Sequence, residues 1–152
     1  SVGTVQRYKA RFVAKGYTQR LGLDYAETYA PVVKLDSLQT ILSIAAHRDL
    51  DMIQLDVCTA FLYRDVEEEL YVRQPEDFIS TNNASLVCRL HKGLYGLKQA
   101  SRLWNSKFDV FLTTFGFISS QADPCVYLQK TNSEFTILAI WVDDGIVCSN
   151  ST

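Results

Sequence analysis

Proline and glycine are scarce in this sequence, which holds three prolines and seven glycines among its 152 residues. That composition argues against a long flexible linker or a disordered tail. Long apolar runs are also lacking, since none approaches the roughly 18–20 residues that a membrane-spanning helix needs. The first residues show no signal-peptide pattern. We therefore expect an intracellular protein without a membrane partner.

Cysteine and histidine are few as well. The four cysteines lie far apart and form no Cys-x-x-Cys motif, and the chain has only two histidines. We expect reduced thiols and no zinc site. What the chain does have is an ordinary globular composition, 47% hydrophobic and 21% charged. Its length is sufficient for one domain with a hydrophobic core.

The net charge of −2 hides a segregation of charges along the chain. Residues 65–77 carry six acids and one arginine. Basic residues without any acid occupy two strips, 1–20 and 88–107, and they are Arg7, Lys9, Arg11, Lys15, Arg20, Arg89, Lys92, Lys98, Arg102 and Lys107. Such strips can bind phosphates despite a negative total, because a phosphate responds to the local field. The alternative is that both strips are ordinary solvated faces.

Apolar periodicity predicts two amphipathic helices. The first runs from Asp36 to about His47, and Asp36 followed by Gln39 has the spacing of an N-terminal cap. The second carries an apolar stripe that ends before Gly116, a natural residue for the position after a helix. The stripe consists of Trp104, Phe108, Phe111, Leu112 and Phe115.

Short apolar segments between these helices predict β-strands. "YKARFVAKGY" at 8–17 reads as a strand pair or a strand and turn, and the others are "MIQLDV" at 52–57, "ELYVRQ" at 69–74, "LVCRLH" at 86–91, "CVYLQK" at 125–130, "FTILAIWV" at 135–142 and "GIVCS" at 145–149. The predicted fold class is α+β, with an antiparallel sheet backed by helices on one face.

Carboxylates stand at two points of this expected sheet. Asp56 lies on the face of its strand opposite the aliphatic stripe, and Asp143-Asp144-Gly145 interrupts an apolar hairpin. An Asp-Gly pair between apolar strands is by itself a turn signal. If the hairpin lies beside Asp56, however, three carboxylates repel one another unless divalent cations lie between them. Two Mg²⁺ ions about 3.5–4 Å apart support phosphoryl transfer, but spacing alone does not distinguish a polymerase from a nuclease.

Six blocks in order along the chain resemble copia-type LTR-retrotransposon reverse transcriptases. They are "YKARFVAKGYTQ", "ETYAPVV", "QLDVCTAFL", "EELYVRQPEDF", "CRLHKGLYGLKQASRLW" and "WVDDGIVC". The resemblance implies the fingers and palm of a right-hand polymerase, without the thumb. Residues 1–152 would form a partial reverse transcriptase domain, with about 1–50 mainly fingers and about 51–152 mainly palm. A fingers insertion would occupy about 65–95.

The same resemblance implies roles for the acids and for one aromatic residue. Asp56 falls on the first palm aspartate, and Asp143 and Asp144 fall on the paired aspartates. Asp56 and Asp143 would hold two Mg²⁺ ions and Asp144 would make a looser contact with them, with Mn²⁺ as an alternative metal. Phe61 falls on the aromatic that blocks a nucleotide's 2′-hydroxyl. That role requires the chain to leave strand geometry soon after Val57, and a plain core position is the alternative.

Further positions would bind the nucleotide or the nucleic acid. The backbone near Tyr95 and Gly96 would approach the incoming nucleotide and the template. Lys9, Arg11 and Lys15 are candidates for the triphosphate and the template backbone, and Arg11 is favoured because guanidinium suits bidentate phosphate contact. Two more candidates for nucleic-acid binding are Lys98 and Trp141. Lys98 would contact phosphate, with a plain solvent-exposed position at the start of a helix as the alternative, and Trp141 would support the primer terminus.

Three residues depart from the family pattern: Cys58 replaces Lys, Ser101 replaces Pro and Trp141 replaces Tyr. The expected function is RNA-directed DNA polymerase, and the partners would be an RNA or DNA template with its primer, deoxynucleoside triphosphates, and the thumb and RNase H segments of the same polyprotein. The location would be the cytoplasm, in a virus-like particle, with a nuclear phase. Two alternatives stay open: an inactive retrotransposon remnant with residual nucleic-acid binding, and another two-metal phosphotransferase such as a nuclease or cyclase.

Overall fold

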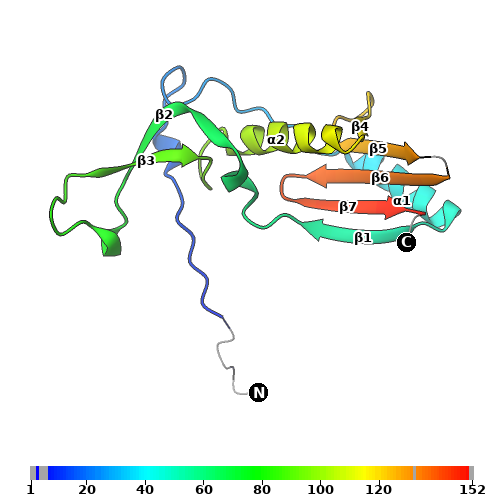
Figure 1. The fold of residues 1–152 in the computed structure, drawn as a ribbon, viewed down its shortest axis with the longest axis horizontal. Helices are drawn as coiled ribbons and strands as arrows, with labels where there is room; N and C mark the ends of the chain where they lie inside the picture. Colours follow the sequence, from blue (N-terminus) through cyan, green and yellow to red (C-terminus); the bar gives the residue numbers. More distant parts are fainter. Residues whose placement is uncertain (1–2, 4–6, 132, 151–152) are drawn as a thin grey trace.

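A computed structural model of the chain describes residues 3, 7–131 and 133–150. It contains two α-helices, seven strands and three short 3-10 helices (Figure 1). The elements in chain order are η1 (Gly16–Thr18), α1 (Leu35–Arg48), β1 (Asp51–Asp56), η2 (Ala60–Tyr63), β2 (Asp65–Arg73), η3 (Glu76–Phe78), β3 (Val87–Lys92), α2 (Ala100–Thr114), β4 (Ile118–Ser119), β5 (Val126–Thr131), β6 (Glu134–Trp141) and β7 (Asp144–Ser149).

The strands form two separate antiparallel sheets. The larger sheet has the order β1-β7-β6-β5-β4, and β2 pairs only with β3 in a two-stranded sheet. Figure 1 shows the smaller sheet beyond the end of the larger one at which β1 ends and β7 begins. The predicted α+β class with antiparallel strands is therefore confirmed. The two-residue edge strand β4 was not predicted, because so short a strand leaves no alternating pattern.

The two helices lie on opposite faces of the larger sheet, so the expectation that both cover one face is wrong. In β6, Ile137 and Ala139 belong to the same buried cluster as the α1 side chains, whereas Leu138 and Ile140 cluster with α2. Successive side chains of a strand point to opposite faces. β6 is therefore buried on both sides, and in Figure 1 its ribbon passes in front of α1.

Helix α1 is capped from a distant loop and not by the predicted residue. Its N-cap position is Lys34, and Asp36 lies inside the first turn. The buried carboxylate of Asp123 accepts a hydrogen bond from the Lys34 N–H at 2.8 Å and one from the Cys125 N–H at 3.0 Å. The Ser37 hydroxyl also binds Asp123. A cap from 89 residues away in sequence has no local signal.

We expect Asp123→Asn to destabilise the protein by about 1–3 kcal/mol at pH 7, because an amide nitrogen then faces backbone donors. Burial alone raises the pKa of Asp123, but the hydrogen bonds from Lys34, Ser37 and Cys125 outweigh burial, and the net pKa is lowered. This contribution to stability is therefore complete above the unfolded pKa of about 3.9 and is lost as the pH falls through the folded pKa.

Urea unfolding across pH 3–7 measures this difference. Asp36→Asn is the matched control, since its side chain makes no capping hydrogen bond and its loss should cost less than about 0.5 kcal/mol. Equal effects of the two substitutions would contradict the assignment of Asp123 as the cap.

Helix α2 ends as its sequence predicts. Gly116 has a φ of 83°, its N–H donates to the Thr113 carbonyl at 3.0 Å, and the Phe117 N–H donates to the Leu112 carbonyl at 3.1 Å. This pair of hydrogen bonds is a Schellman motif with glycine in the left-handed position. Phe117 then packs against the cluster that contains Leu112, which fixes the exit from the helix.

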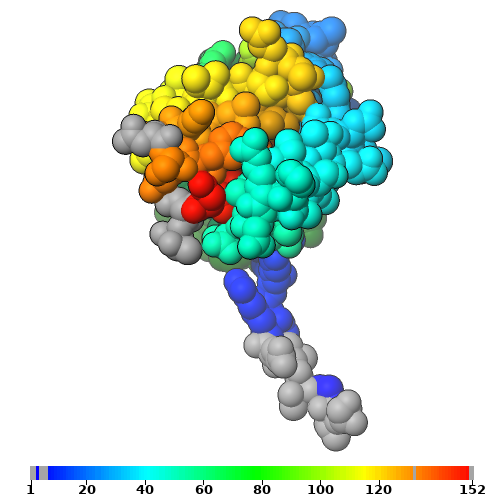
Figure 2. All heavy atoms as spheres, turned by 90° about the vertical axis from the view of Figure 1, so that its right-hand side faces the viewer, coloured from blue at the N-terminus to red at the C-terminus, as the bar shows by residue number. Residues whose placement is uncertain are grey.

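The N-terminal basic segment, residues 7–15, is not the predicted strand. It pairs with no strand among the described residues, and its Ala14 N–H donates to the distant Tyr95 carbonyl at 2.8 Å. An alternating pattern predicts a strand only where another strand can pair with it. In Figure 2 the blue residues of this segment project away from the body of the molecule.

No helix in the described part of the chain is long and apolar enough to cross a membrane. The four cysteines are free thiols, of which Cys125 and Cys148 are buried. Burial raises the pKa of Cys125 to about 11, so this thiol stays protonated at neutral pH.

Candidate active site

The three predicted aspartates lie at one end of the larger sheet. Asp56 ends β1, Asp144 begins β7, and the two residues are directly paired in the antiparallel register. The Val57 N–H donates to the Asp143 carbonyl at 2.8 Å, which fixes the hairpin to the end of β1. The register thus brings residues 87 or more positions apart in sequence to one place.

The hairpin turn consists of Val142 and Asp143, one residue earlier than the predicted Asp143-Asp144-Gly145. Trp141 and Asp144 are the last paired residues, and Val142 has a φ of 58°. Positive φ at the first central residue alone is the pattern of a type II′ turn. The second aspartate is consequently a strand residue, and the first is a turn residue.

Gly145 lies inside β7 and serves close packing, not turn formation. A Cβ atom at this position would lie 2.9 Å from the Ala139 carbonyl oxygen and 3.0 Å from Leu55 Cδ1. Its φ is not positive. Glycine is required here because the backbone of β7 passes tightly between its two neighbouring strands.

Asp56, Asp144 and Trp141 form one row across three strands. Trp141 pairs with Asp144, and Asp144 pairs with Asp56, so all three side chains point to the same face. Trp141 shares that face with Ala139, which packs in the cluster of α1. The row therefore lies on the α1 face, beyond the end of the buried cluster. The carboxylates therefore share their face of the sheet with α1, whereas the prediction put both helices on one face.

The three carboxylates have the chemistry of a hard-cation site. Asp56 is exposed, Asp143 and Asp144 are half-buried, and their oxygens make no hydrogen bond or ion pair within the described residues. Unpaired like charges directly opposite each other repel, and Mg²⁺ or Mn²⁺ relieves such repulsion through carboxylate oxygens. Among residues 3, 7–131 and 133–150, however, no three His, Cys, Asp or Glu side chains already stand in a metal-holding group.

Three residues predicted to bind nucleotide form a contiguous group. The chain leaves strand geometry at Thr59, with a φ of 59°, and enters η2, which carries Phe61. The Phe61 and Tyr95 rings meet edge to face with centroids 4.7 Å apart. The Arg11 guanidinium lies 5.8 Å from the centre of the Tyr95 ring. The geometry that the Phe61 prediction required is thus present.

Gly96 is needed for contact with the chain itself. Its φ is 90°, and a Cβ atom there would overlap the carbonyl oxygen of Ala14. A Cβ atom at Gly16 would in turn overlap the carbonyl oxygen of Gly96. The segment at 14–16 and the Tyr95-Gly96 turn therefore meet backbone to backbone, as only glycine allows.

The remaining predicted basic residues differ in their surroundings. Lys9 and Lys15 are exposed, and their side chains make no hydrogen bond or ion pair with the described residues. Lys98 is exposed too, but its Nζ lies 4.9 Å from the Tyr25 ring centre and 3.2 Å from the Tyr25 hydroxyl. Arg102, also in the second basic strip, pairs with Glu27 at 3.1 Å.

A buried amide that the sequence did not single out joins three segments. Gln99 is 1% exposed, accepts a hydrogen bond from Gln19 Nε2 at 3.0 Å, and donates to the Asp24 carbonyl and to Glu68. It therefore links residues 19–24, β2 and the start of α2. These partners lie 31 to 80 residues from Gln99 in sequence, so no local pattern could have shown the network.

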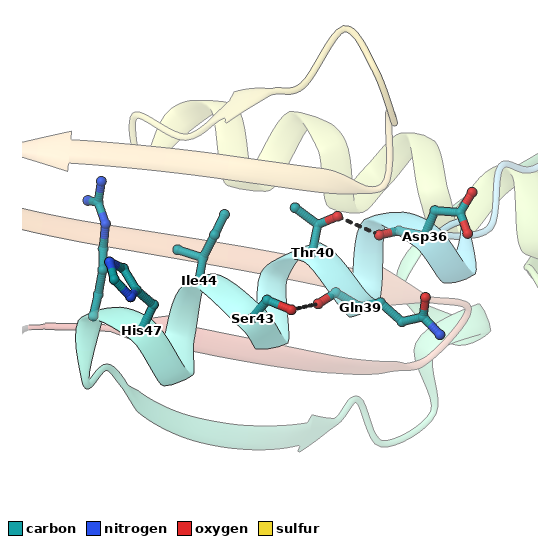
Figure 3. A pocket seen from close by; sticks show the side chains of 7 residues that line it. Asp36, Gln39, Thr40, Ser43, Ile44 and His47 are labelled. Atoms are coloured by element: carbon teal, nitrogen blue, oxygen red, sulfur yellow. Dashed lines mark hydrogen bonds between the residues drawn. The ribbon is translucent and has the colours of Figure 1, made fainter.

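A surface hollow of about 660 Å³ lies along α1, away from all predicted site residues (Figure 3). The Thr40 and Ser43 hydroxyls donate back to the helix carbonyls of Asp36 and Gln39, at 2.7 and 2.8 Å. Because one helix supplies the whole lining and these donors are already used, the hollow offers little to a ligand. A smaller cavity of about 230 Å³ lies behind the hairpin turn, between α2 and residues 28–32.

Comparison with known proteins identifies the family to which the chain belongs. The family model described as reverse transcriptase (RNA-dependent DNA polymerase) matches residues 2–152. The chain is 49% identical over 142 residues to the retrovirus-related Pol polyprotein from transposon TNT 1-94 of Nicotiana tabacum, covering 93% of the chain and 11% of that protein. It is 42% identical over 152 residues to the Pol polyprotein from transposon RE2 of Arabidopsis thaliana, covering the whole chain and 10% of that protein.

The chain thus spans about a tenth of the length of these curated relatives. No solved structure matches it. The ordered sequence blocks and the two plant transposon relatives support the same assignment, and the resemblance to copia-type enzymes is confirmed. The chain belongs to the reverse transcriptase (RNA-dependent DNA polymerase) family.

Proposed function

We propose that the chain forms the fingers and palm of an RNA-directed DNA polymerase whose metal site consists of Asp56, Asp143 and Asp144. The observation that carries the proposal is the β1–β7 register, which pairs Asp56 with Asp144 while Val57 binds the Asp143 backbone. Three carboxylates at one sheet end, with no hydrogen-bond or ion-pair partner among the described residues, repel one another, and a bound divalent cation would offset this repulsion.

The two separate sheets support a division of the chain into fingers and palm. The larger sheet with α1 and α2 would be the palm, which moves α1 out of residues 1–50, expected to be mainly fingers. The separate sheet of β2 and β3 falls within the predicted fingers insertion at 65–95. The N-terminal basic segment would complete the fingers. We further propose that thumb and RNase H segments of the same polyprotein complete the grip on the primer and template.

The residues of the chain would divide the work of nucleotide transfer. Two Mg²⁺ ions, or Mn²⁺, held by the aspartates would supply activation of the primer 3′-hydroxyl and charge neutralisation at the leaving pyrophosphate. Arg11, Lys9 and Lys15 would neutralise triphosphate and template charge. Trp141, in the row with Asp144 and Asp56, would support the primer end by stacking.

Primer extension tests this function. A full-length Pol protein that contains this chain should extend oligo(dT) on poly(rA) with dTTP and Mg²⁺, and chelation of the metal should abolish extension. A folded protein that binds the primer and template but never extends the primer would refute the catalytic proposal and favour the remnant.

Phe61→Ala should raise ribonucleotide incorporation, expressed as the ratio of kcat/KM for UTP to that for dTTP, by about tenfold or more. The aromatic ring at η2 would otherwise exclude the 2′-hydroxyl. Because Phe61 is half-buried and packs against two core clusters, the variant should also lose about 1–3 kcal/mol of stability. Leu62→Ala, on the same 3-10 helix, is the control. Unchanged discrimination in an active Phe61→Ala protein would leave Phe61 as a core residue only.

A further inference from the structure

The turn that carries the aspartate pair has a strained backbone. Val142 adopts a φ of 58°, in the left-handed region. A β-branched side chain is an outlier there, at a cost of about 1–2 kcal/mol. Such a conformation persists only where neighbouring structure holds it. Val142 is itself 39% exposed, so burial of its own side chain is not what holds the turn.

Trp104 of α2 reaches this turn with its one polar atom. The side chain is 5% exposed, and its indole Nε1–H donates to the Val142 carbonyl at 2.6 Å. Its ring lies between those of Phe108, at 5.1 Å, and Tyr63, at 6.0 Å. Packing therefore fixes the indole, and the fixed N–H acts as a rigid donor aimed at the turn.

The space behind the turn is otherwise incompletely filled. The cavity of about 230 Å³ is bounded by both Trp104 and Val142, and its other walls come from residues 28–32 and from Ser101 and Asn105. Close packing consequently does not hold the turn on this side. The indole hydrogen bond bridges α2 and the hairpin across the edge of that cavity.

We propose that Trp104 is a positioning residue: its indole N–H holds the Val142 carbonyl and keeps the turn in the conformation that presents the carboxylates of Asp143 and Asp144 to the metal ions. The inference rests on the proposed function, because it concerns the metal affinity of those two aspartates together with Asp56. Trp104 would support the turn from the α2 face of the sheet, opposite the face that carries the carboxylates.

Trp104→Phe tests it, because the phenyl ring keeps the aromatic packing and lacks the donor. We expect Mn²⁺ affinity, measured by electron paramagnetic resonance on the folded chain, to fall about 10-fold or more, as for other residues that orient metal ligands. Adding Val142→Gly should restore part of the affinity, since glycine adopts positive φ without support. Leu112→Ala, in the same cluster one turn beyond Phe108, should cost stability without changing Mn²⁺ affinity.

Hydrogen exchange separates this inference from the proposed function. The Val57 amide donates to Asp143, so its exchange rate reports the state of the turn without any metal. Faster exchange in Trp104→Phe than in Leu112→Ala, with lost Mn²⁺ affinity, supports the inference. If the wild type binds no Mn²⁺ and the Val57 amide of Trp104→Phe still exchanges faster than that of Leu112→Ala, Trp104 positions the turn and the metal proposal has failed. Unchanged exchange or unchanged Mn²⁺ affinity in a metal-binding protein overturns the role of Trp104.

Discussion

Asp56→Asn should lower primer extension by at least about 100-fold, the effect of removing one preorganised electrostatic group from an active site. The amide keeps the size of the side chain and its place at the end of β1, but loses the charge that a divalent cation needs. The measurement is kcat for dTTP on poly(rA)·oligo(dT) with a full-length Pol protein that contains this chain.

The free energy of unfolding of Asp56→Asn should not fall with its activity. Asp56 stands directly opposite Asp144, and like charges at paired positions are destabilising by about 0.2–1 kcal/mol. In metal-free buffer, Asp56→Asn should therefore unfold at the same or slightly higher urea concentration than the wild type. Loss of activity without loss of stability is the expected sign of a functional carboxylate.

Asp51→Asn is the matched control, since Asp51 is exposed and begins the strand that Asp56 ends. It makes the same change of charge at the far end of β1 and should leave extension within about twofold. If the two variants extend equally well, Asp56 is not a metal ligand and the proposed site is wrong.

Local periodicity predicted most of the larger sheet and both helices. α2 follows its apolar stripe and ends at Gly116 with the expected cap. The uncharged run at 135–142, most of which forms β6, also indicates a strand that is buried on both faces. A strand exposed on one face alternates apolar with polar residues, whereas β6 is continuously apolar over residues 137–141, where α1 and α2 cover its two faces.

Contacts between distant segments could not be predicted in the same way. The cap of α1 by Asp123 and the Gln99 network join residues far apart in sequence, and each depends on the completed fold. The segment at 7–15 shows the converse, because its pattern suited a strand but it pairs with no strand among the described residues.

The candidate site was predicted as a set of residues more completely than as a geometry. The aspartates meet at one sheet end, and Arg11, Tyr95 and Phe61 form one group. The turn, however, begins at Val142, because the pairing of Trp141 with Asp144 and not the Asp-Gly sequence decides the register. Register depends on the whole hairpin, so a short turn signal locates it only to within a residue.

Gly96→Ala should destabilise the protein by about 2–5 kcal/mol and detach the N-terminal basic segment. Two costs combine. The first is conformational, because a φ of 90° disfavours any residue with a Cβ atom by about 1–2 kcal/mol. Overlap with the backbone oxygen of Ala14 adds about 1–3 kcal/mol, because a backbone atom cannot move as a flexible side chain does. Urea unfolding measures the combined loss in the free energy of unfolding.

Two other glycines separate these costs. Gly22 has a φ of 79° with open space around it, so Gly22→Ala should show the conformational cost alone, about 1–2 kcal/mol. Gly16 has no positive φ but faces the Gly96 carbonyl, so Gly16→Ala should show the overlap alone, about 1–3 kcal/mol. Because Gly16 and Gly96 form one contact, the double variant should cost less than the sum of the single ones. A Gly96→Ala cost no larger than that of Gly22→Ala would mean that the contact with Ala14 does not form, and Arg11 would then lack the anchor that brings it over Tyr95.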